Sequence, residues 1–168
     1  MATVAFILDD VFEDSEFQVP YDEVRKAGHE ALVVGLKEGK EVTGKKGATV
    51  RIEHDVADVD PDRVDALVVP GGYSPDKIRT SPGMVELTRQ TFASGKPVAA
   101  ICHAGWMLAE ADVVRNKTVT SVASIRTDLV NAGATWVDEE VVEDGNLITS
   151  RTPADLPAFC KALLTQIG

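Results

Sequence analysis

The chain contains little cysteine and little histidine. Two cysteines, Cys102 and Cys160, occur among 168 residues, and two thiols without a Cys-x-x-Cys pair do not make a disulfide scaffold. No His-x-His, His-Glu-x-x-His or cysteine cluster accompanies the 3 histidines, which argues against a metal site. Gly-x-Gly-x-x-Gly and P-loop sequences are also missing. We therefore expect free thiols, no metal and no cofactor.

Long apolar runs are missing as well. No run approaches the roughly 20 residues that span a bilayer. The start, Met1 to Leu8, lacks a basic region and runs into Asp9 and Asp10, which argues against a signal peptide. We expect a cytoplasmic protein that has no membrane partner.

Basic residues are fewer than acidic residues. The 17 Lys and Arg face 27 Asp and Glu, which gives a net charge of −10. Such a surface repels phosphate backbones and argues against nucleic acid as the primary partner, although it does not identify a substrate. Hydrophobic residues make up 44% and charged residues 26%, as in globular domains. The length predicts a single domain over 1–168.

Short apolar runs alternate with helical segments. The pattern predicts strands at 3–8, 31–34, 66–69, 98–101 and 117–122, hairpins at 42–53 and 141–150, and helices at 15–27, 83–93, 104–111, 125–132 and 153–166. This alternation indicates an α/β fold with a mainly parallel sheet covered on both faces. Ligands of such sheets bind beyond the carboxyl ends of the strands, which here are residues 9–16, 70–73 and 102–105.

Cys102 lies between the apolar strand 98–101 and a helical segment. A strand-to-helix elbow exposes its central side chain, and the amino end of a helix lowers the pKa of a thiol. This position predicts a nucleophile, with a buried structural cysteine as the alternative. Cys160, by contrast, lies near Phe159 and Leu163 in an amphipathic helix and is predicted to pack in the core.

The other two strand ends carry glycines and glutamates. Gly71 and Gly72 can adopt positive φ and expose N–H groups for an oxyanion hole, or simply form a tight turn. Glu13 and Glu16 open the first helix, where acidic residues ordinarily stabilise the helix. A buried glutamate that faces a cysteine can instead keep its proton and donate to the thiolate. Gly71, Gly72 and Glu13 are predicted as oxyanion or binding residues.

The histidines exclude two familiar triads. Class I glutamine amidotransferases and α/β-hydrolases place the catalytic histidine after the nucleophile, and no histidine follows His103. His103 is next to Cys102, but consecutive residues at a sharp turn usually point in different directions, so their pairing is open. His29 and His54 are predicted to lie on the surface.

Together these residues resemble the ThiJ/PfpI superfamily, and most closely its PfpI branch. The resemblance covers essentially the whole chain. It rests on Ala99-Ala100-Ile101-Cys102-His103, Pro70-Gly71-Gly72, Glu13-x-x-Glu16-x-x-x-Pro20, Thr43-Gly44-Lys45 and the blocks 131–138 and 150–156. It implies a flavodoxin-like three-layer sandwich with a nucleophile elbow, and a homo-oligomer, either a dimer or a hexamer.

The same resemblance implies roles for four residues. Cys102 matches the family nucleophile, and Glu16 matches the glutamate that hydrogen-bonds it. His103 matches the histidine of PfpI-type sites, whose acid partner comes from a neighbouring subunit. Asp76 falls where that branch commonly has this acid, usually a glutamate.

Three functions follow from the resemblance. The leading one is a cysteine-dependent stress-response hydrolase or lyase that acts on reactive carbonyls or their adducts, as deglycases and glyoxalase-like enzymes do. The second is an intracellular cysteine peptidase that uses Cys102, His103 and a trans acid on peptide substrates. The third is a redox sensor or chaperone without catalysis, because an accessible thiolate oxidises readily.

Overall fold

The computed structural model describes all residues from Met1 to Gly168. Its centre is a seven-stranded sheet of order β10-β11-β7-β6-β1-β2-β5. The strands are β1 (Thr3–Ile7), β2 (Glu30–Gly35), β5 (His54–Asp55), β6 (Ala66–Val69), β7 (Val98–Ile101), β10 (Val142–Asp144) and β11 (Leu147–Ser150). All neighbouring pairs are parallel except β10 and β11. Every residue of β6 and β7 is buried, as continuous apolar runs in a parallel sheet require.

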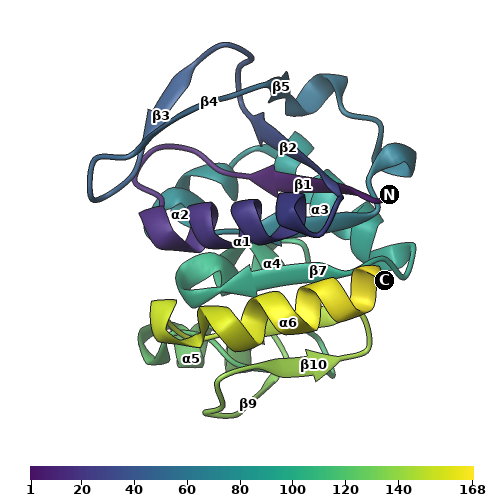
Figure 1. Cartoon of the computed structure of the whole chain (residues 1–168). Coiled ribbons are helices and arrows are strands. Elements are labelled where there is room, and N and C mark those ends of the chain that lie inside the picture. The colour runs from purple at the N-terminus through teal and green to yellow at the C-terminus, as the bar shows by residue number, and fades with distance from the viewer.

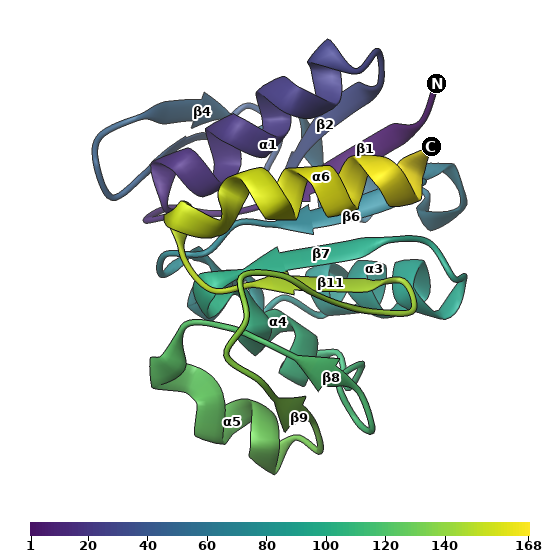
Figure 2. The ribbon, with the colours of Figure 1, turned by 60° about the horizontal axis from the view of Figure 1, so that its bottom comes forward.

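Helices cover both faces of this sheet (Figures 1 and 2). One face carries α1 (Asp14–Lys26) and α6 (Leu156–Ile167), and the other carries α2 (Ser74–Ile78), α3 (Pro82–Ala93), α4 (Gly105–Glu110) and α5 (Arg126–Asn131). Along β1, Val4 and Phe6 join the core under α1 and α6, whereas Ala5 and Ile7 join the opposite core, because successive side chains of a strand alternate. The predicted three-layer sandwich is confirmed.

Two small sheets are attached to this frame. β3 (Glu41–Thr43) and β4 (Thr49–Arg51) form the predicted hairpin. The strand predicted at 117–122 is wrong in extent: β8 (Thr118–Val119) is short and pairs with β9 (Thr135–Trp136) outside the main sheet. Thr120 leaves the ladder because its N–H donates to the Thr149 hydroxyl at 2.9 Å. His54, predicted to lie on the surface, is exposed and begins the edge strand β5, which pairs with β2.

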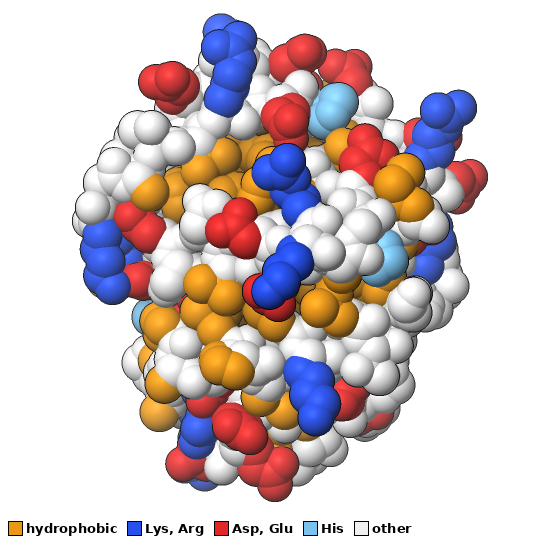
Figure 3. All heavy atoms as spheres, in the orientation of Figure 1, with side chains coloured by type: hydrophobic (Ala, Val, Ile, Leu, Met, Phe, Trp, Pro, Cys, Tyr) orange, Lys and Arg blue, Asp and Glu red, His pale blue; other side chains and the backbone are white.

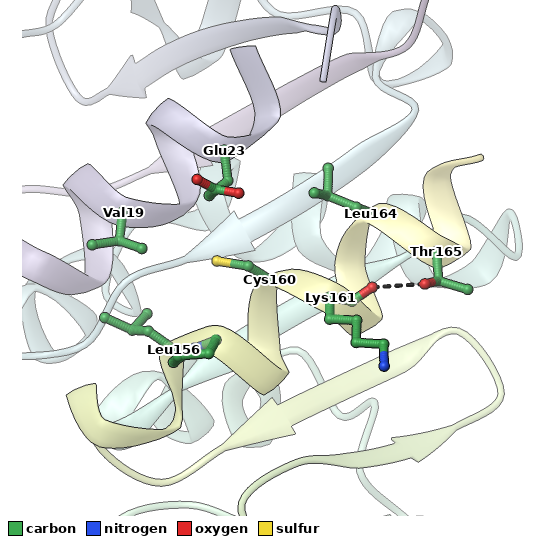
Figure 4. A pocket seen from close by; sticks show the side chains of 8 residues that line it. Val19, Glu23, Leu156, Cys160, Lys161, Leu164 and Thr165 are labelled. Atoms are coloured by element: carbon green, nitrogen blue, oxygen red, sulfur yellow. Dashed lines mark hydrogen bonds between the residues drawn. The ribbon is translucent and has the colours of Figure 1, made fainter. Parts of the chain in front are cut away.

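A hollow of about 670 Å³ lies between α1 and α6 (Figure 4). Hydrophobic side chains reach the surface among charged ones on this face of the molecule (Figure 3). Cys160 points from α6 toward α1 in Figure 4 and is 5% exposed, so its predicted place in the core is confirmed. No residue of the predicted active site lines this hollow. No helix of the structure combines the length and the apolar character needed to cross a membrane.

Candidate active site

The carboxyl ends of β1, β6 and β7 bring the predicted site residues together. These strands are parallel neighbours in the sheet, so their carboxyl ends lie at one edge. The Gly71 N–H donates to Oε1 of Glu16 at 2.9 Å. A Cβ atom at Gly71 would lie 2.9 Å from the Cys102 Cβ and 2.8 Å from the Ile101 carbonyl oxygen. Glu16, Gly71 and Cys102 therefore form one tightly packed group.

Cys102 occupies a strained elbow. Its φ is 63°, a left-handed conformation that costs a residue with a side chain about 1–3 kcal/mol. A 3₁₀ turn over Cys102–Ala104 follows, and α4 begins at Gly105. The side chain is partly exposed. The strand-to-helix elbow thus presents the thiol at the sheet edge.

Gly72 needs to be glycine. Its φ is 76°, and a Cβ atom there would lie 2.6 Å from the backbone nitrogen of Glu13. This close approach comes from an antiparallel bridge between Phe12 and Gly72. The backbone N–H groups of His103 and Gly72 both act to lower the pKa of Cys102. The predicted oxyanion hole at the glycine pair stays a prediction.

Glu16 is fully buried. Burial raises its pKa from 4.5 to about 8, although the Gly71 N–H acts in the opposite direction. Its Oε1 accepts from Gly71, whereas Oε2 has no hydrogen-bond partner within the chain. At neutral pH the carboxyl group keeps its proton, and that proton is free to be donated from Oε2.

The thiol pKa differs from the prediction. Burial, followed by the charge that Glu16 carries when ionised, raises the pKa of Cys102 to about 12, against the lowering by the His103 and Gly72 N–H groups. The predicted lowering by a helix amino end is wrong in this balance, because burial outweighs the backbone N–H groups. Protonation of Glu16 removes its charge and with it this contribution to the pKa of the thiol, so the titrations of the two groups are coupled.

His103 pairs with Cys102 in this chain. Its Nδ1 lies 3.4 Å from Sγ of Cys102, and its Nε2 lies 3.3 Å from the hydroxyl of Ser124. The imidazole ring packs near the rings of Tyr73 and Trp106, with centroid distances of 6.1 Å and 5.0 Å. Burial, and then the charge of Lys45, lower its pKa, so the ring is neutral at pH 7 and can accept a proton.

Asp76 does not contact His103 within the chain. It lies exposed on α2, beside a surface hollow that Arg79 and Glu110 also line. The second nitrogen of His103 faces Ser124, a residue that sequence reasoning missed. A role for Asp76 in a neighbouring subunit stays a prediction.

Glu13 was predicted as an oxyanion or binding residue, but its carboxylate binds two lysines. Its carboxylate forms ion pairs with Lys45 at 3.3 Å and Lys46 at 2.8 Å. Although burial opposes it, these two ammonium groups lower the pKa of Glu13. Both lysines come from the turn between β3 and β4, which sequence reasoning described as a turn without linking it to the site. The carboxylate of Glu13 therefore holds this turn, and only its backbone N–H takes part near the glycines, donating to Gly71 O at 3.1 Å.

The structure contains no group of three or more His, Cys, Asp or Glu side chains that could hold a metal ion. The chemistry available at the sheet edge is that of a thiol, a protonated carboxyl group, a neutral imidazole and two backbone donors. These features define an α/β protein with a cysteine at a strand-to-helix elbow.

Comparison with known proteins identifies the family of this chain. A profile of the DJ-1/PfpI family matches residues 2–166, and the chain belongs to this family. It is 49% identical over 167 residues to Protein/nucleic acid deglycase 2 of Escherichia coli, covering 98% of this chain and 97% of that protein. It is 44% identical over 164 residues to the Bacillus subtilis protein named "Putative cysteine protease YraA", covering 98% of this chain and 97% of that one.

Solved structures agree with this assignment. DJ-1beta of Drosophila melanogaster has a TM-score of 0.91 at 34% identity, covering 99% of this chain and 91% of that one. A two-domain protein of Anabaena variabilis with DJ-1/ThiJ/PfpI-like and ferritin-like domains has a TM-score of 0.98 at 38% identity. The chain is covered completely in that match but spans only 48% of the two-domain protein. The predicted ThiJ/PfpI membership is confirmed.

Proposed function

We propose that this protein is a cysteine-dependent enzyme that removes reactive carbonyls, as free α-oxoaldehydes or as their adducts with amines. The observation that carries the proposal is the packing of Cys102 and the fully buried Glu16 around Gly71, with the His103 imidazole 3.4 Å from the Cys102 sulfur. Relatives named as deglycases, at 49% and 44% identity over nearly the whole chain, support it.

The first step is addition of the thiol to an aldehyde carbon. The Cys102 proton passes to Nδ1 of His103, 3.4 Å away, as Sγ forms a bond to the carbon and the C=O electron pair moves to oxygen. The Gly72 and His103 N–H groups stabilise that oxygen, and Oε2 of Glu16 protonates it. A hemithioacetal results. An amine adduct enters at the same intermediate when sulfur displaces the amine.

The second step converts the hemithioacetal into an acid. The Glu16 carboxylate removes the proton from the sulfur-bearing carbon and returns it to the neighbouring carbonyl carbon, while a second proton moves from the hydroxyl oxygen to the former ketone oxygen. This transfer gives a thioester of a 2-hydroxy acid. Water then attacks the thioester: one water proton passes to the Glu16 carboxylate, and His103 returns its proton to the departing Cys102 sulfur. One α-oxoaldehyde and one water thereby become one 2-hydroxy acid, and all three side chains regain their starting protonation.

Two cysteine variants test this function. Cys102→Ala is expected to lose methylglyoxal turnover in the purified protein, whereas Cys160→Ala, which also removes a thiol, is expected to keep it. Full turnover by Cys102→Ala would overturn the proposal. Cys160→Ala is the control, because it shows whether removal of any one thiol lowers methylglyoxal turnover.

A peptidase is the second candidate, and the contact between His103 and Cys102 favours it. Amide cleavage needs a protonated leaving group, which His103 can supply when an acid stabilises its imidazolium form. If Asp76 of a neighbouring subunit is that acid, peptide hydrolysis should disappear in Asp76→Asn and in a monomeric variant. Peptide hydrolysis that is unchanged in both would reject this candidate. The third alternative, a redox sensor, rests on the partial exposure of Cys102 and stays a prediction.

A further inference from the structure

Ser124 is the partner of the second ring nitrogen of His103. Its hydroxyl oxygen lies 3.3 Å from Nε2, while the other ring nitrogen, Nδ1, lies 3.4 Å from the Cys102 sulfur. One imidazole ring therefore joins the thiol to a hydroxyl group. In a neutral imidazole one nitrogen carries the proton and the other accepts one, so a bond that fixes the state of Nε2 also fixes the state of Nδ1.

The loop that carries Ser124 is attached to the cysteine elbow at two points. The Val122 N–H donates to the Cys102 carbonyl oxygen at 3.4 Å. On the other side of Ser124, Ile125 is buried, and its Cδ1 lies 3.2 Å from the Cβ position of Gly105. Because both neighbours of Ser124 in the loop contact the segment that follows β7, the Ser124 hydroxyl is held at the imidazole although its side chain is exposed.

Two aromatic rings restrict rotation of the imidazole. The centroid of the Trp106 ring lies 5.0 Å from that of His103, and Nε1 of Trp106 is itself fixed by a 2.9 Å hydrogen bond to Asp128. The Tyr73 ring stacks against the imidazole with 28° between the two planes. These contacts keep Nδ1 toward the sulfur and Nε2 toward the hydroxyl, but they do not decide which nitrogen carries the proton.

The proposed chemistry needs one of the two neutral forms of His103. Nδ1 can take the Cys102 proton only when it carries none of its own, so the ring proton must then be on Nε2. A proton on Nε2 needs an acceptor, and the Ser124 hydroxyl oxygen is the acceptor at that nitrogen within the chain. In the other neutral form, Nδ1–H would face a thiol that keeps its own proton, because burial raises the pKa of Cys102 to about 12. The thiol proton would then have no acceptor on the ring.

We propose that Ser124 is a positioning residue that holds the ring proton of His103 on Nε2 and so leaves Nδ1 free to take the Cys102 proton. This inference rests on the proposed function and adds a residue to it. As the proton moves, the S–H bond breaks, its electron pair stays on sulfur and an Nδ1–H bond forms. The resulting imidazolium keeps its Nε2–H on the Ser124 hydroxyl, and a hydrogen bond from a charged donor is stronger than one from a neutral donor.

Nitrogen NMR of the protein labelled in its histidine rings measures this proton directly, without any turnover. The native spectrum at neutral pH should show a protonated Nε2 and an unprotonated Nδ1 for His103, whose signals are assigned by their loss in His103→Gln. Ser124→Ala should lower the ratio of the two neutral forms by about two- to tenfold, as expected for the loss of one neutral hydrogen bond. Ser124→Thr keeps the hydroxyl group and should keep the native ratio.

Alkylation of Cys102 by chloroacetamide gives a second readout. Sulfur bonds to the methylene carbon, chloride leaves, and the thiol proton passes to Nδ1 of His103; mass spectrometry follows the product. Ser124→Ala should slow this reaction by about two- to tenfold, because the hydroxyl stabilises the imidazolium more than the neutral ring. Ser94→Ala is the matched control, because it removes an exposed serine hydroxyl at the end of α3 that donates to Gln90 O. It should change neither readout.

The native chain alone can overturn the inference, since a ring proton on Nδ1 would contradict it whatever the variants do. An unchanged ratio in Ser124→Ala would also overturn it. If Asp76→Asn changed the ratio instead, an acid of a neighbouring subunit would be the partner of Nε2, and the assignment to Ser124 would be wrong.

The same measurements separate this inference from the proposed function. If methylglyoxal is not turned over but Ser124→Ala shifts the ring proton and slows alkylation, the proposed function fails and the role of Ser124 stands. If methylglyoxal is turned over and Ser124→Ala changes neither readout, only the role of Ser124 fails.

Discussion

The Gly71 backbone N–H donates to Oε1 of the fully buried Glu16 at 2.9 Å. This bond joins the end of β6 to α1 and leaves Oε2 as the free oxygen of the carboxyl group. Because a Cβ atom at Gly71 would meet Cys102, the same contact sets the carboxyl group against the thiol. The proton on Glu16 is therefore both a structural and a chemical feature of this edge of the sheet.

Replacement of Glu16 by glutamine should alter the pH dependence of stability. The pKa of Glu16 is about 8 in the folded chain and 4.5 in its ordinary state, so the folded state holds its proton more tightly than the unfolded one. The native chain should therefore lose stability as the pH rises from about 4.5 through about 8. Glu16→Gln cannot ionise and should lack this loss. Denaturant unfolding at several pH values measures the difference, and parallel curves would contradict it.

Replacement of Gly71 by alanine should harm both stability and turnover. The new methyl group would meet Oε1 of Glu16 and the Ile101 carbonyl oxygen, which lies 2.8 Å from the Cβ position. We expect a loss of about 1–3 kcal/mol in the free energy of unfolding, and methylglyoxal turnover at least about tenfold lower, because the N–H to Glu16 shifts. Gly83→Ala, in helix α3, is the control; its nearest contact is a Val56 methyl at 3.1 Å, and its stability should change by less than about 1 kcal/mol. A Gly71→Ala protein as stable and active as this control would refute the packing argument.

Replacement of Asp155 by asparagine should destabilise the chain by about 2–3 kcal/mol at neutral pH. The Asp155 carboxylate is 3% exposed and accepts from the backbone N–H of Arg151 at 2.9 Å and from Nε and NH2 of its guanidinium at 2.9 Å and 3.0 Å. Burial opposes ionisation, but these bonds prevail and lower the pKa of Asp155. Its stabilising effect is present above pH 3.8 and lost as the pH falls through the lower, folded value. The difference between Asp155→Asn and the native chain should shrink accordingly in acid, as urea unfolding would measure.

The fold followed from the sequence more readily than the site did. Continuous apolar runs predicted β6 and β7 because parallel strands are buried on both faces. The positions of Cys102, Gly71 and Glu16 followed from the rule that ligands bind at the carboxyl ends of such strands. The ion-pair partners of Glu13 could not be predicted in this way, because Lys45 and Lys46 lie more than 30 residues along the chain and no periodicity links them to Glu13. The thiol pKa was predicted in the wrong direction because burial is a property of the packed structure.

The pH dependence of turnover should show that the charge of Lys45 lowers the pKa of His103. Burial, and then Lys45, lower the pKa of this imidazole below 6.5, so the loss of kcat/KM in acid should lie below that pH. Lys45→Met removes the second cause and should move the acid limb toward higher pH. An acid limb that stays in place, with Lys46→Met as the charge-matched control, would show that Lys45 does not act on His103.

The protonation state of Glu16 tests the central claim most directly. Infrared difference spectra of the native chain and Glu16→Gln isolate the C=O band of this one carboxyl group. We expect the band of a protonated carboxylic acid at pH 7, which disappears as the pH rises through about 8. A carboxylate band already present at pH 6 would contradict the account, because Glu16 would then have no proton to donate at the Cys102 thiol.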